Sequence, residues 1–138
     1  MKSSIEAGIV FMENIHKEIL GLMGKVDINC RNEGNIIIFD LAGQLDIYNS
    51  GELQKLVEAY VARGFNKLVI NLEKVTYMDS STISVFIGSH QRVKKSGGRF
   101  LLANLQGAPR VVFDMAKLHD VFEVFADVSS ATQNLLAS

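Results

Sequence analysis

The order in which strand-like and helix-like segments follow one another constrains the fold of this chain more than any other feature. Two strand-like segments begin the region after residue 24, and from there amphipathic helical patterns alternate with short apolar runs to the end of the chain. Such alternation predicts a mostly parallel sheet with right-handed crossovers, and the first two segments predict one antiparallel hairpin. The sequence therefore predicts a single α/β domain over residues 25–138, with a central sheet and about four helices.

The strand-like segments differ in the burial that their patterns predict. Val26, Ile28 and Cys30 alternate with polar residues, as in an edge strand with one solvated face. The run Ile36–Phe39 is continuously β-branched or aromatic, which indicates a strand covered on both faces and paired with the first one. Gly43–Asp46 is then expected to be a loop. Further strands are predicted at 68–72, 100–103 and 121–125.

Capping residues and glycines mark the helix boundaries. Asn49 followed three residues later by Glu52 is a capping-box pattern, and Gly64 is placed to end that helix with a positive φ. Asp79 or Ser80 is a preferred residue for capping the next helix. The sequence thus predicts one helix from about residue 50 to 63 and a second from about residue 80.

Two more helices complete the pattern. A helix is predicted near Pro109, because proline is favoured in a first helical turn, and a last one is predicted after Asp127 or Ser129 as its cap. Met78 and the phenylalanines stand at core spacing. The helix near Pro109 is expected to contribute these apolar residues to the core: Val111, Val112, Met115 and Leu118.

Residues 1–24 form a segment set apart from the domain. Apolar residues recur at steps of three or four from Ile5 to Met23, which predicts an amphipathic helix. Its apolar face must pack against the main domain, a second copy of the chain or a partner. A homodimer through this helix is therefore one interpretation, and we expect the domain to stay folded when the segment is deleted.

Composition excludes several classes of function. The chain has 138 residues and a formal net charge of −1, so it has no overall basic field that would attract nucleic acid or an anionic membrane. A single cysteine cannot form an internal disulfide or a multi-cysteine metal site. The apolar runs are far shorter than the roughly 20 residues that cross a bilayer. We expect a cytoplasmic protein with no metal, no other cofactor and no direct contact with nucleic acid or membrane.

The segment Met78–Thr82 is the first candidate for function, because ligands of parallel sheets bind beyond the carboxyl ends of the strands. Three hydroxyl residues follow Asp79 there, and no Lys or Arg occurs between Val75 and Gln91. In the structural interpretation, Asp79 or Ser80 only caps a helix. In the functional one, Ser80 or its neighbour carries a phosphate whose charge beside Asp79 acts on a partner by repulsion or by new pairing.

A catalytic role for these hydroxyls fails on geometry. His90 lies ten residues further along the same predicted helix, about 15 Å from Ser80, too far for a general base. His90 is expected at the edge of the core, whereas His16 and His119 are isolated and are expected to be structural or solvated. Zinc-protease and phosphate-loop motifs do not occur. We therefore expect a protein that is not an enzyme.

The alternative from another class is a small α/β enzyme or a receiver domain. A receiver needs an acidic cluster after its first strand, an aspartate acceptor and a lysine near its last strand. Here the segment Val121–Phe125 is followed by Ala126 and Asp127 instead. Turnover of a small substrate would be needed to support this alternative.

Two remaining features have structural interpretations. Cys30 is expected to be a packed thiol. The basic residues near the end of the second helix are expected to form a solvated helix end that complements the helix dipole: Arg92, Lys94, Lys95 and Arg99.

Taken together, the residues resemble the bacterial anti-sigma factor antagonists, whose fold is called the STAS domain. The resemblance extends from about Val26 to Leu136. It rests on four groups in a fixed order: Gly43-Gln44-Leu45-Asp46, Leu68-Val69-Ile70-Asn71-Leu72 leading to Tyr77-Met78-Asp79-Ser80-Ser81, Gly97-Gly98, and Phe113-Asp114-Met115 followed by Leu118.

The resemblance implies a regulatory role. In that family the serine after the aspartate is phosphorylated by an ATP-binding serine kinase that is also the anti-sigma factor, and a metal-dependent serine phosphatase reverses the reaction. Carried over, Ser80 is the acceptor and Ser81 a secondary acceptor. Asp79 shapes the acceptor loop, and Asp46 and Thr82 join these three residues in contacting the partner. The unmodified protein would bind the anti-sigma factor and so release a sigma factor for transcription.

The chain departs from the family pattern in two places. The family usually has Gly after Asp-Ser-Ser, whereas this chain continues with Thr82, Ile83 and Ser84, which is expected to add bulk where the kinase approaches. Residues 1–24 are an addition. STAS domains with such additions resemble subunits of stress-sensing assemblies, and others serve in transport complexes. A scaffold subunit that binds its partners without a phosphorylation switch is therefore the alternative function.

Overall fold

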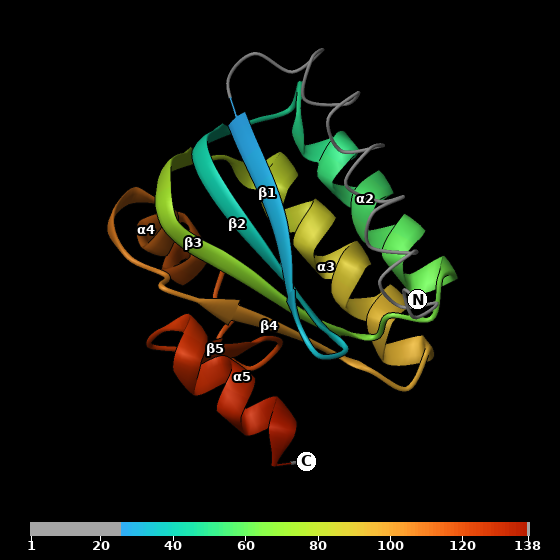
Figure 1. Ribbon diagram of the computed structural model, residues 1–138. Coiled ribbons are helices and arrows are strands. Elements are labelled where there is room, and N and C mark those ends of the chain that lie inside the picture. Colours follow the sequence, from blue (N-terminus) through green and yellow to red (C-terminus); the bar gives the residue numbers. More distant parts are fainter. Residues whose placement is uncertain (1–25, 138) are drawn as a thin grey trace.

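A computed structural model of the protein describes residues 26–137 (Figure 1). The helix expected over residues 1–24, and with it the homodimer through that helix, lies outside the described residues. In chain order the elements are β1 (Val26–Glu33), β2 (Ile36–Leu45), α2 (Ser50–Ala62), β3 (Lys67–Met78), α3 (Ser80–Lys95), β4 (Arg99–Ala103), α4 (Gly107–Met115), β5 (Glu123–Phe125) and α5 (Val128–Leu136).

The strands form one five-stranded sheet in the order β1-β2-β3-β4-β5. β1 pairs with β2 in antiparallel orientation, and the other neighbours are parallel and are connected through helices. The β1–β2 turn has two central residues, and the first of them, Gly34, has φ +60°, which suits a type II′ hairpin turn. The predicted mixed sheet with one N-terminal hairpin is confirmed.

Helices cover the two faces of the sheet unequally. Side chains from α2, α3 and α4, among them Leu53, Phe86 and Phe113, pack on one face, whereas Ala131 and Leu135 of α5 pack on the other. Figure 1 shows α5 alone on its side of the sheet. Successive residues of the run 36–39 enter the two cores in turn. The prediction that this strand is covered on both faces is confirmed.

Two strands extend further than the sequence predicts. β2 continues through the expected loop to Leu45, and β3 continues through Tyr77 to Met78. The added residues pair with one another, Gln44 opposite Tyr77 and Leu45 opposite Met78, after register shifts on either side of Gly43. Pairing between the two strands therefore extends both of them as far as the candidate loop. This extension cannot be predicted from the residue pattern of either segment alone. The last strand, in contrast, is shorter than predicted and covers Glu123–Phe125.

The inward face of α4 also differs from the prediction. Phe113 is fully buried, but Met115 is 78% exposed and Val111 is 57% exposed. A residue two positions away lies about 200° around a helix, so the inward placement of Phe113 turns both neighbours to solvent. The prediction that Val111 and Met115 belong to the core was wrong, and those for Met78 and Leu118 are confirmed.

Candidate functional site

The candidate site lies where β2 and β3 end side by side. Leu45 and Met78 are register partners, so the next residues of the two strands, Asp46 and Asp79, are brought to the same edge of the sheet. A backbone hydrogen bond from the N–H of Asp79 to the carbonyl of Leu45, at 3.3 Å, joins the two strand ends. This is the position that the parallel topology predicts for a functional crevice.

The Asp79 carboxylate holds two segments at once. Its Oδ1 accepts a hydrogen bond from the backbone N–H of Ser81 at 3.0 Å, which caps α3, and its Oδ2 accepts one from the backbone N–H of Ile47 at 3.2 Å. Oδ1 also accepts the hydroxyl proton of Ser81. The prediction that Asp79 caps this helix is confirmed. Its second oxygen additionally fixes the loop after β2 against the start of α3.

The loop after β2 is built around Asn49. The side-chain Oδ1 of Asn49 accepts from the backbone N–H of Asp46 at 3.0 Å, and its Nδ2 donates to the carbonyl of Gln44 at 2.8 Å. Because Asn49 is buried, these bonds satisfy backbone groups that are costly to leave unpaired. The predicted capping box was wrong, since Asn49 makes no side-chain bond to α2 and Glu52 pairs instead with Lys55.

The three consecutive hydroxyls have different environments. Ser80 is exposed, and its side chain makes no hydrogen bond within residues 26–137. Ser81 is half-buried, and its hydroxyl is held by Asp79 and by Ser50 Oγ at 3.2 Å. Thr82 is fully buried. Of the three, Ser80 presents its hydroxyl to an approaching macromolecule.

The residues that replace the family's glycine point mostly inward. Thr82 has no exposed surface and Ile83 is 7% exposed, whereas Ser84 is exposed and donates its hydroxyl to the carbonyl of Ser80 at 3.3 Å. The expectation that Thr82 and Ile83 add bulk at the surface was wrong. The reason is the register of α3, which directs both side chains beneath the helix.

Large apolar side chains are exposed to solvent around the carboxyl ends of β2 and β3. Ile47 is 69% exposed, Tyr48 is 86% exposed and Tyr77 is 46% exposed. We call these three residues together with Ser80 the loop-end surface. The sequence reasoning missed the apolar members, although one signal existed: Ile47 and Tyr48 follow Asp46 outside any strand or helix pattern.

The histidines do not contribute to this surface. His90 packs against the rings of Phe100 and Phe122, and burial, followed by the charge of Lys94, lowers its pKa below 6.5. Its predicted place at the core edge is confirmed. His119 is not isolated, because its Nε2 lies 2.5 Å from Asp114 Oδ1. His16 lies outside the described residues.

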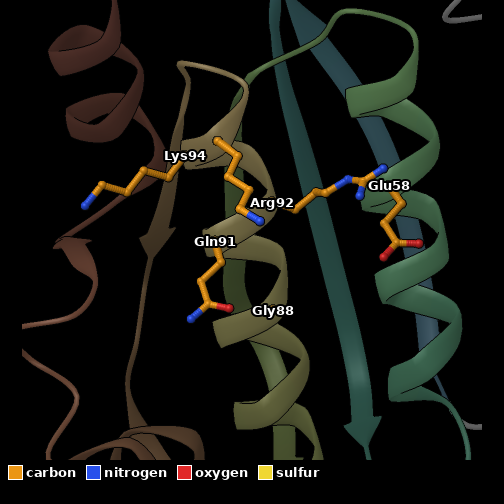
Figure 2. Close-up of a pocket in the computed structure, with 6 residues that line it drawn as sticks. Glu58, Gly88, Gln91, Arg92 and Lys94 are labelled. Atoms are coloured by element: carbon orange, nitrogen blue, oxygen red, sulfur yellow. The ribbon is translucent and has the colours of Figure 1, made fainter.

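A basic groove occupies the opposite end of α3 from Ser80. Figure 2 shows Glu58 of α2 facing the Gly88–Lys95 segment of α3 across this open groove, which has a volume of about 790 Å³. Arg92, Lys94 and Lys95 are exposed, as predicted for a solvated helix end. Arg99 differs, because it leaves this group to pair with Glu123 at 2.6 Å.

Neither a metal centre nor a membrane span is visible in the part of the chain that the structure describes. No group of three or more His, Cys, Asp or Glu side chains within residues 26–137 is arranged to hold a metal ion. Among the helices described, none is long and apolar enough to cross a membrane.

The fold and the site define the class of this protein as a small α/β domain that presents exposed apolar side chains and the accessible Ser80 at the end of its sheet. The STAS domain model matches residues 27–131. The chain belongs to the STAS domain family, which confirms the resemblance seen in the sequence.

Curated relatives and solved structures agree with this assignment. The chain is 31% identical over 108 residues to the anti-sigma-B factor antagonist of Bacillus subtilis (strain 168), covering 78% of this chain and 98% of the relative. It is 28% identical over 99 residues to that of Listeria monocytogenes, covering 72% and 86%. The unphosphorylated anti-sigma factor antagonist SpoIIAA has the same fold, with a TM-score of 0.70 at 20% identity over 81% of this chain and 98% of that one. An antagonist from Mycobacterium paratuberculosis gives 0.72 at 18% identity over 79% and 92%.

Proposed function

We propose that this protein is an anti-sigma factor antagonist whose binding to its partner is switched by phosphorylation of Ser80. The observation that carries the proposal is the difference among three adjacent hydroxyls, of which Ser80 is exposed while Ser81 is bonded and Thr82 is buried. The relatives that share this domain over almost their whole length are themselves named anti-sigma factor antagonists. The unmodified protein would bind an anti-sigma factor and so release a sigma factor for transcription.

The loop-end surface has the character of a protein-binding site. Exposed tyrosines and an isoleucine offer apolar area and aromatic contacts of the kind that dominate protein interfaces. Asp79 and Asn49 hold the two loops in fixed positions, so little ordering entropy would be lost on binding. A preformed apolar surface around Ser80 supports the binding of a folded partner there.

A phosphate on Ser80 would change the charge of this surface without local compensation. The Asp79 carboxylate already occupies the Ser81 N–H at the start of α3, and the chain segments 46–51 and 75–91 contain no Lys or Arg. A phosphoserine adds up to about two negative charges at neutral pH. Burying that charge beside two carboxylates is costly. Phosphorylation is therefore expected to abolish partner binding.

In this role the protein is a substrate and not a catalyst. The kinase would be the anti-sigma factor itself, a serine kinase with an ATP-binding fold, and a metal-dependent serine phosphatase would restore the unmodified form. Asp46, Asp79, Ser81 and Thr82 would shape or border the contact, with Ser81 as a secondary acceptor if its hydrogen bonds open. Sigma factor regulation of this kind takes place in the cytoplasm.

Mapping the phosphate tests the proposal. The protein is isolated from its native cells under growth and under stress, and phosphopeptides spanning residues 75–91 are sequenced by mass spectrometry. We expect phosphate on Ser80, lost in Ser80→Ala and retained in Ser84→Ala, the matched control for an exposed hydroxyl on the same helix. Phosphate on Ser81 or Thr82 in place of Ser80 would contradict the choice of acceptor, and no phosphate in any condition would favour the constitutive scaffold subunit instead.

A further inference from the structure

A hydrogen bond between two serine hydroxyls joins the first turns of α2 and α3. Ser50 is the first residue of α2 and Ser81 the second residue of α3, and their Oγ atoms lie 3.2 Å apart. Ser50 is only 3% exposed, whereas Ser81 is half-buried. Within residues 26–137 the Ser50 hydroxyl has no other hydrogen-bond partner. A buried hydroxyl is costly to leave unpaired, so this contact restrains both side chains.

The direction of the bond follows from the chemistry of the groups that surround Ser81. The Ser81 hydroxyl is also bonded to Oδ1 of Asp79. A carboxylate accepts hydrogen bonds and does not donate them, so the single hydroxyl proton of Ser81 goes to Asp79. The Ser50 hydroxyl must therefore donate to Ser81 Oγ. The bonds form a directed chain from Ser50 through Ser81 to Asp79, in which each bond polarises the next.

The two adjacent serines of α3 are therefore unequal in what their hydroxyls are free to do. Ser81 Oγ donates to Asp79 and accepts from Ser50, whereas the exposed Ser80 hydroxyl makes no hydrogen bond within the described part of the chain. Turning the Ser81 hydroxyl toward solvent would break two bonds. It would also leave the buried Ser50 hydroxyl without a partner, which adds to the cost.

Phosphoryl transfer requires an acceptor hydroxyl that is free of such bonds. The acceptor Oγ attacks the γ-phosphorus of a nucleoside triphosphate held by the kinase, and the bond from that phosphorus to the leaving nucleoside diphosphate breaks. The hydroxyl proton passes to a base of the kinase. Ser81 can react in this way only after it has turned away from Asp79 and Ser50. Ser80 needs no such change.

We propose that Ser50 is a positioning residue that restricts phosphorylation to Ser80 by holding the Ser81 hydroxyl against α2. The inference rests on the proposed function and deepens it, because it identifies what selects between two adjacent acceptors. Ser50 acts through Ser81 and does not itself contact the reacting groups. Without the Ser50 hydroxyl, Ser81 keeps its bond to Asp79 but turns toward solvent more easily.

Replacing Ser50 tests this role in the full chain. Each variant is isolated from the native cells under the condition in which the wild type carries phosphate, and fragment ions separate phosphate on Ser81 from phosphate on Ser80. We expect Ser50→Ala to raise the ratio of Ser81 to Ser80 phosphate about fivefold, which corresponds to the net contribution of one hydrogen bond, about 1 kcal/mol. Ser50→Thr, which keeps the hydroxyl, should restore the wild-type ratio.

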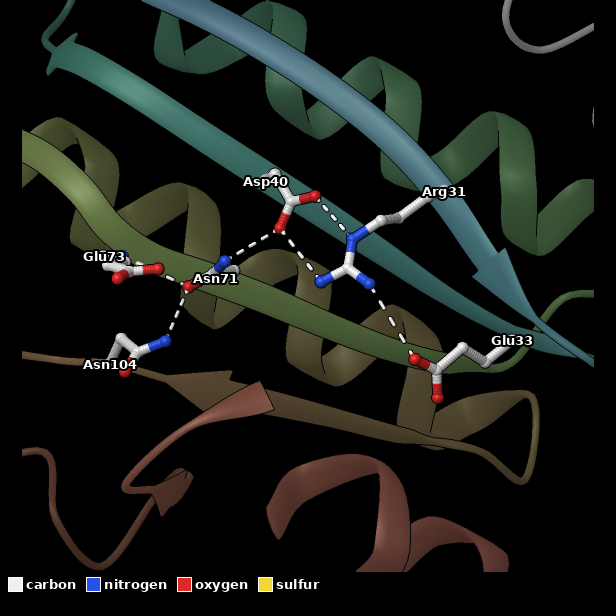
Figure 3. A network of polar contacts seen from close by, with 6 residues as sticks. All are labelled: Arg31, Glu33, Asp40, Asn71, Glu73 and Asn104. Carbon is white, nitrogen blue, oxygen red and sulfur yellow. Dashed lines mark hydrogen bonds and ion pairs between the residues drawn. The ribbon is translucent and has the colours of Figure 1, made fainter. Parts of the chain in front are cut away.

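Two controls separate this effect from a general loss of stability. Ser89→Ala removes the hydroxyl of another buried serine of α3, which is 1% exposed and has no hydrogen-bond partner within residues 26–137. Asn71→Ala disrupts the polar network of Figure 3, in which Asn71 donates to Asp40 at 2.8 Å and accepts from Asn104 at 2.9 Å. Asn71 lies seven residues before Met78 in β3, about 23 Å from the end of the strand. Both controls should keep the wild-type ratio.

The rotamer of Ser81 provides a second readout that needs no kinase. Three-bond couplings between the Hα and Hβ protons of Ser81, measured by NMR, report its χ1 angle. We expect the couplings of a single staggered rotamer in the wild type and in Ser50→Thr. In Ser50→Ala we expect couplings averaged over more than one rotamer.

The possible outcomes distinguish this inference from the proposed function. Phosphate on Ser80 in the wild type with an unchanged ratio in Ser50→Ala would overturn the role of Ser50 alone, and so would averaged Ser81 couplings in the wild type. An equal rise of the ratio in Ser89→Ala or Asn71→Ala would also overturn it, because loss of stability would then be what exposes Ser81. No phosphate on Ser80 in any condition would overturn the proposed function and this inference with it.

Discussion

Asp79 accepts a hydrogen bond from the backbone N–H of Ile47, 32 residues earlier in the chain, at 3.2 Å between Oδ2 and N. The other oxygen of the same carboxylate caps the helix that begins at Ser80. One side chain therefore connects the apolar part of the loop-end surface to the segment that carries the accessible hydroxyl. Its role exceeds that of an ordinary helix cap, and this difference can be measured.

Asp79→Ala should lower both stability and partner binding. Loss of the cap is expected to reduce the free energy of unfolding by about 1 kcal/mol, and loss of the bond to Ile47 should let the loop after β2 move and so weaken anti-sigma factor binding. Urea unfolding and calorimetric titration measure the two effects. Asp127→Ala is the matched control, because Asp127 caps α5 through the Ser130 N–H, away from the site. If both variants bound as tightly as the wild type, Asp79 would be a cap and nothing more.

Gly98→Ala should destabilise the protein more than Gly97→Ala. A Cβ on Gly98 would lie 1.9 Å from the backbone oxygen of Asn66, so the backbone must shift, and the hydrogen bond from Arg99 N–H to that oxygen would be disturbed. At Gly97 a Cβ meets nothing, and the cost is the strain of φ +82°. We expect about 2 kcal/mol or more for Gly98→Ala and about 1 kcal/mol for Gly97→Ala in urea unfolding. If Gly97→Ala destabilised the protein more than Gly98→Ala, the backbone at Gly98 would be able to move away from Asn66 at little cost in free energy.

His90 should make stability depend on pH in a defined direction. Its pKa is lowered from 6.5, first by burial and then by Lys94, while Glu123 acts weakly in the opposite sense. The unfolded chain therefore binds this proton more readily than the folded one. The stabilising contribution is complete above pH 6.5 and is lost as the pH falls through the lower folded pKa.

His90→Gln should accordingly flatten the fall in urea midpoint between about pH 7.5 and 5.5. If the urea midpoint of His90→Gln fell with pH as steeply as that of the wild type, groups other than His90 would cause the pH dependence.

Much of the fold follows from local pattern. The alternating strand at Val26–Cys30, the doubly buried run at 36–39 and the Asp79 and Asp127 caps were all predicted, because each depends on spacing within a few residues. The predicted capping box at Asn49 was wrong because the Asn49 side chain can bond either to the start of α2 or to the loop before it. Only the folded loop brings the carbonyl of Gln44 and the buried N–H of Asp46 within hydrogen-bond distance of the Asn49 side chain.

The candidate site was predicted in position but not in composition. Asp79 and the hydroxyls were expected beyond the carboxyl end of a buried strand, where parallel sheets bind ligands, whereas Asp46 was included only through the resemblance to the family. The exposed Ile47, Tyr48 and Tyr77 were not, because β2 and β3 extend further than their own patterns indicate and their pairing turns Tyr77 outward. The choice among the three hydroxyls likewise required the helix register, which buries Thr82 and ties Ser81 to Asp79.

The most direct test of the account is the affinity of the anti-sigma factor for four forms of this protein: wild type, Ser80→Ala, Ser80→Glu and Ser84→Glu. We expect Ser80→Ala to bind like the wild type and Ser80→Glu to lose binding. Ser84→Glu, which adds the same charge one helical turn away, should retain most of the binding. Circular dichroism melts establish that each variant is folded. Wild-type affinity in Ser80→Glu, or equal losses in the two glutamate variants, would contradict the central claim that charge at Ser80 itself controls the partner.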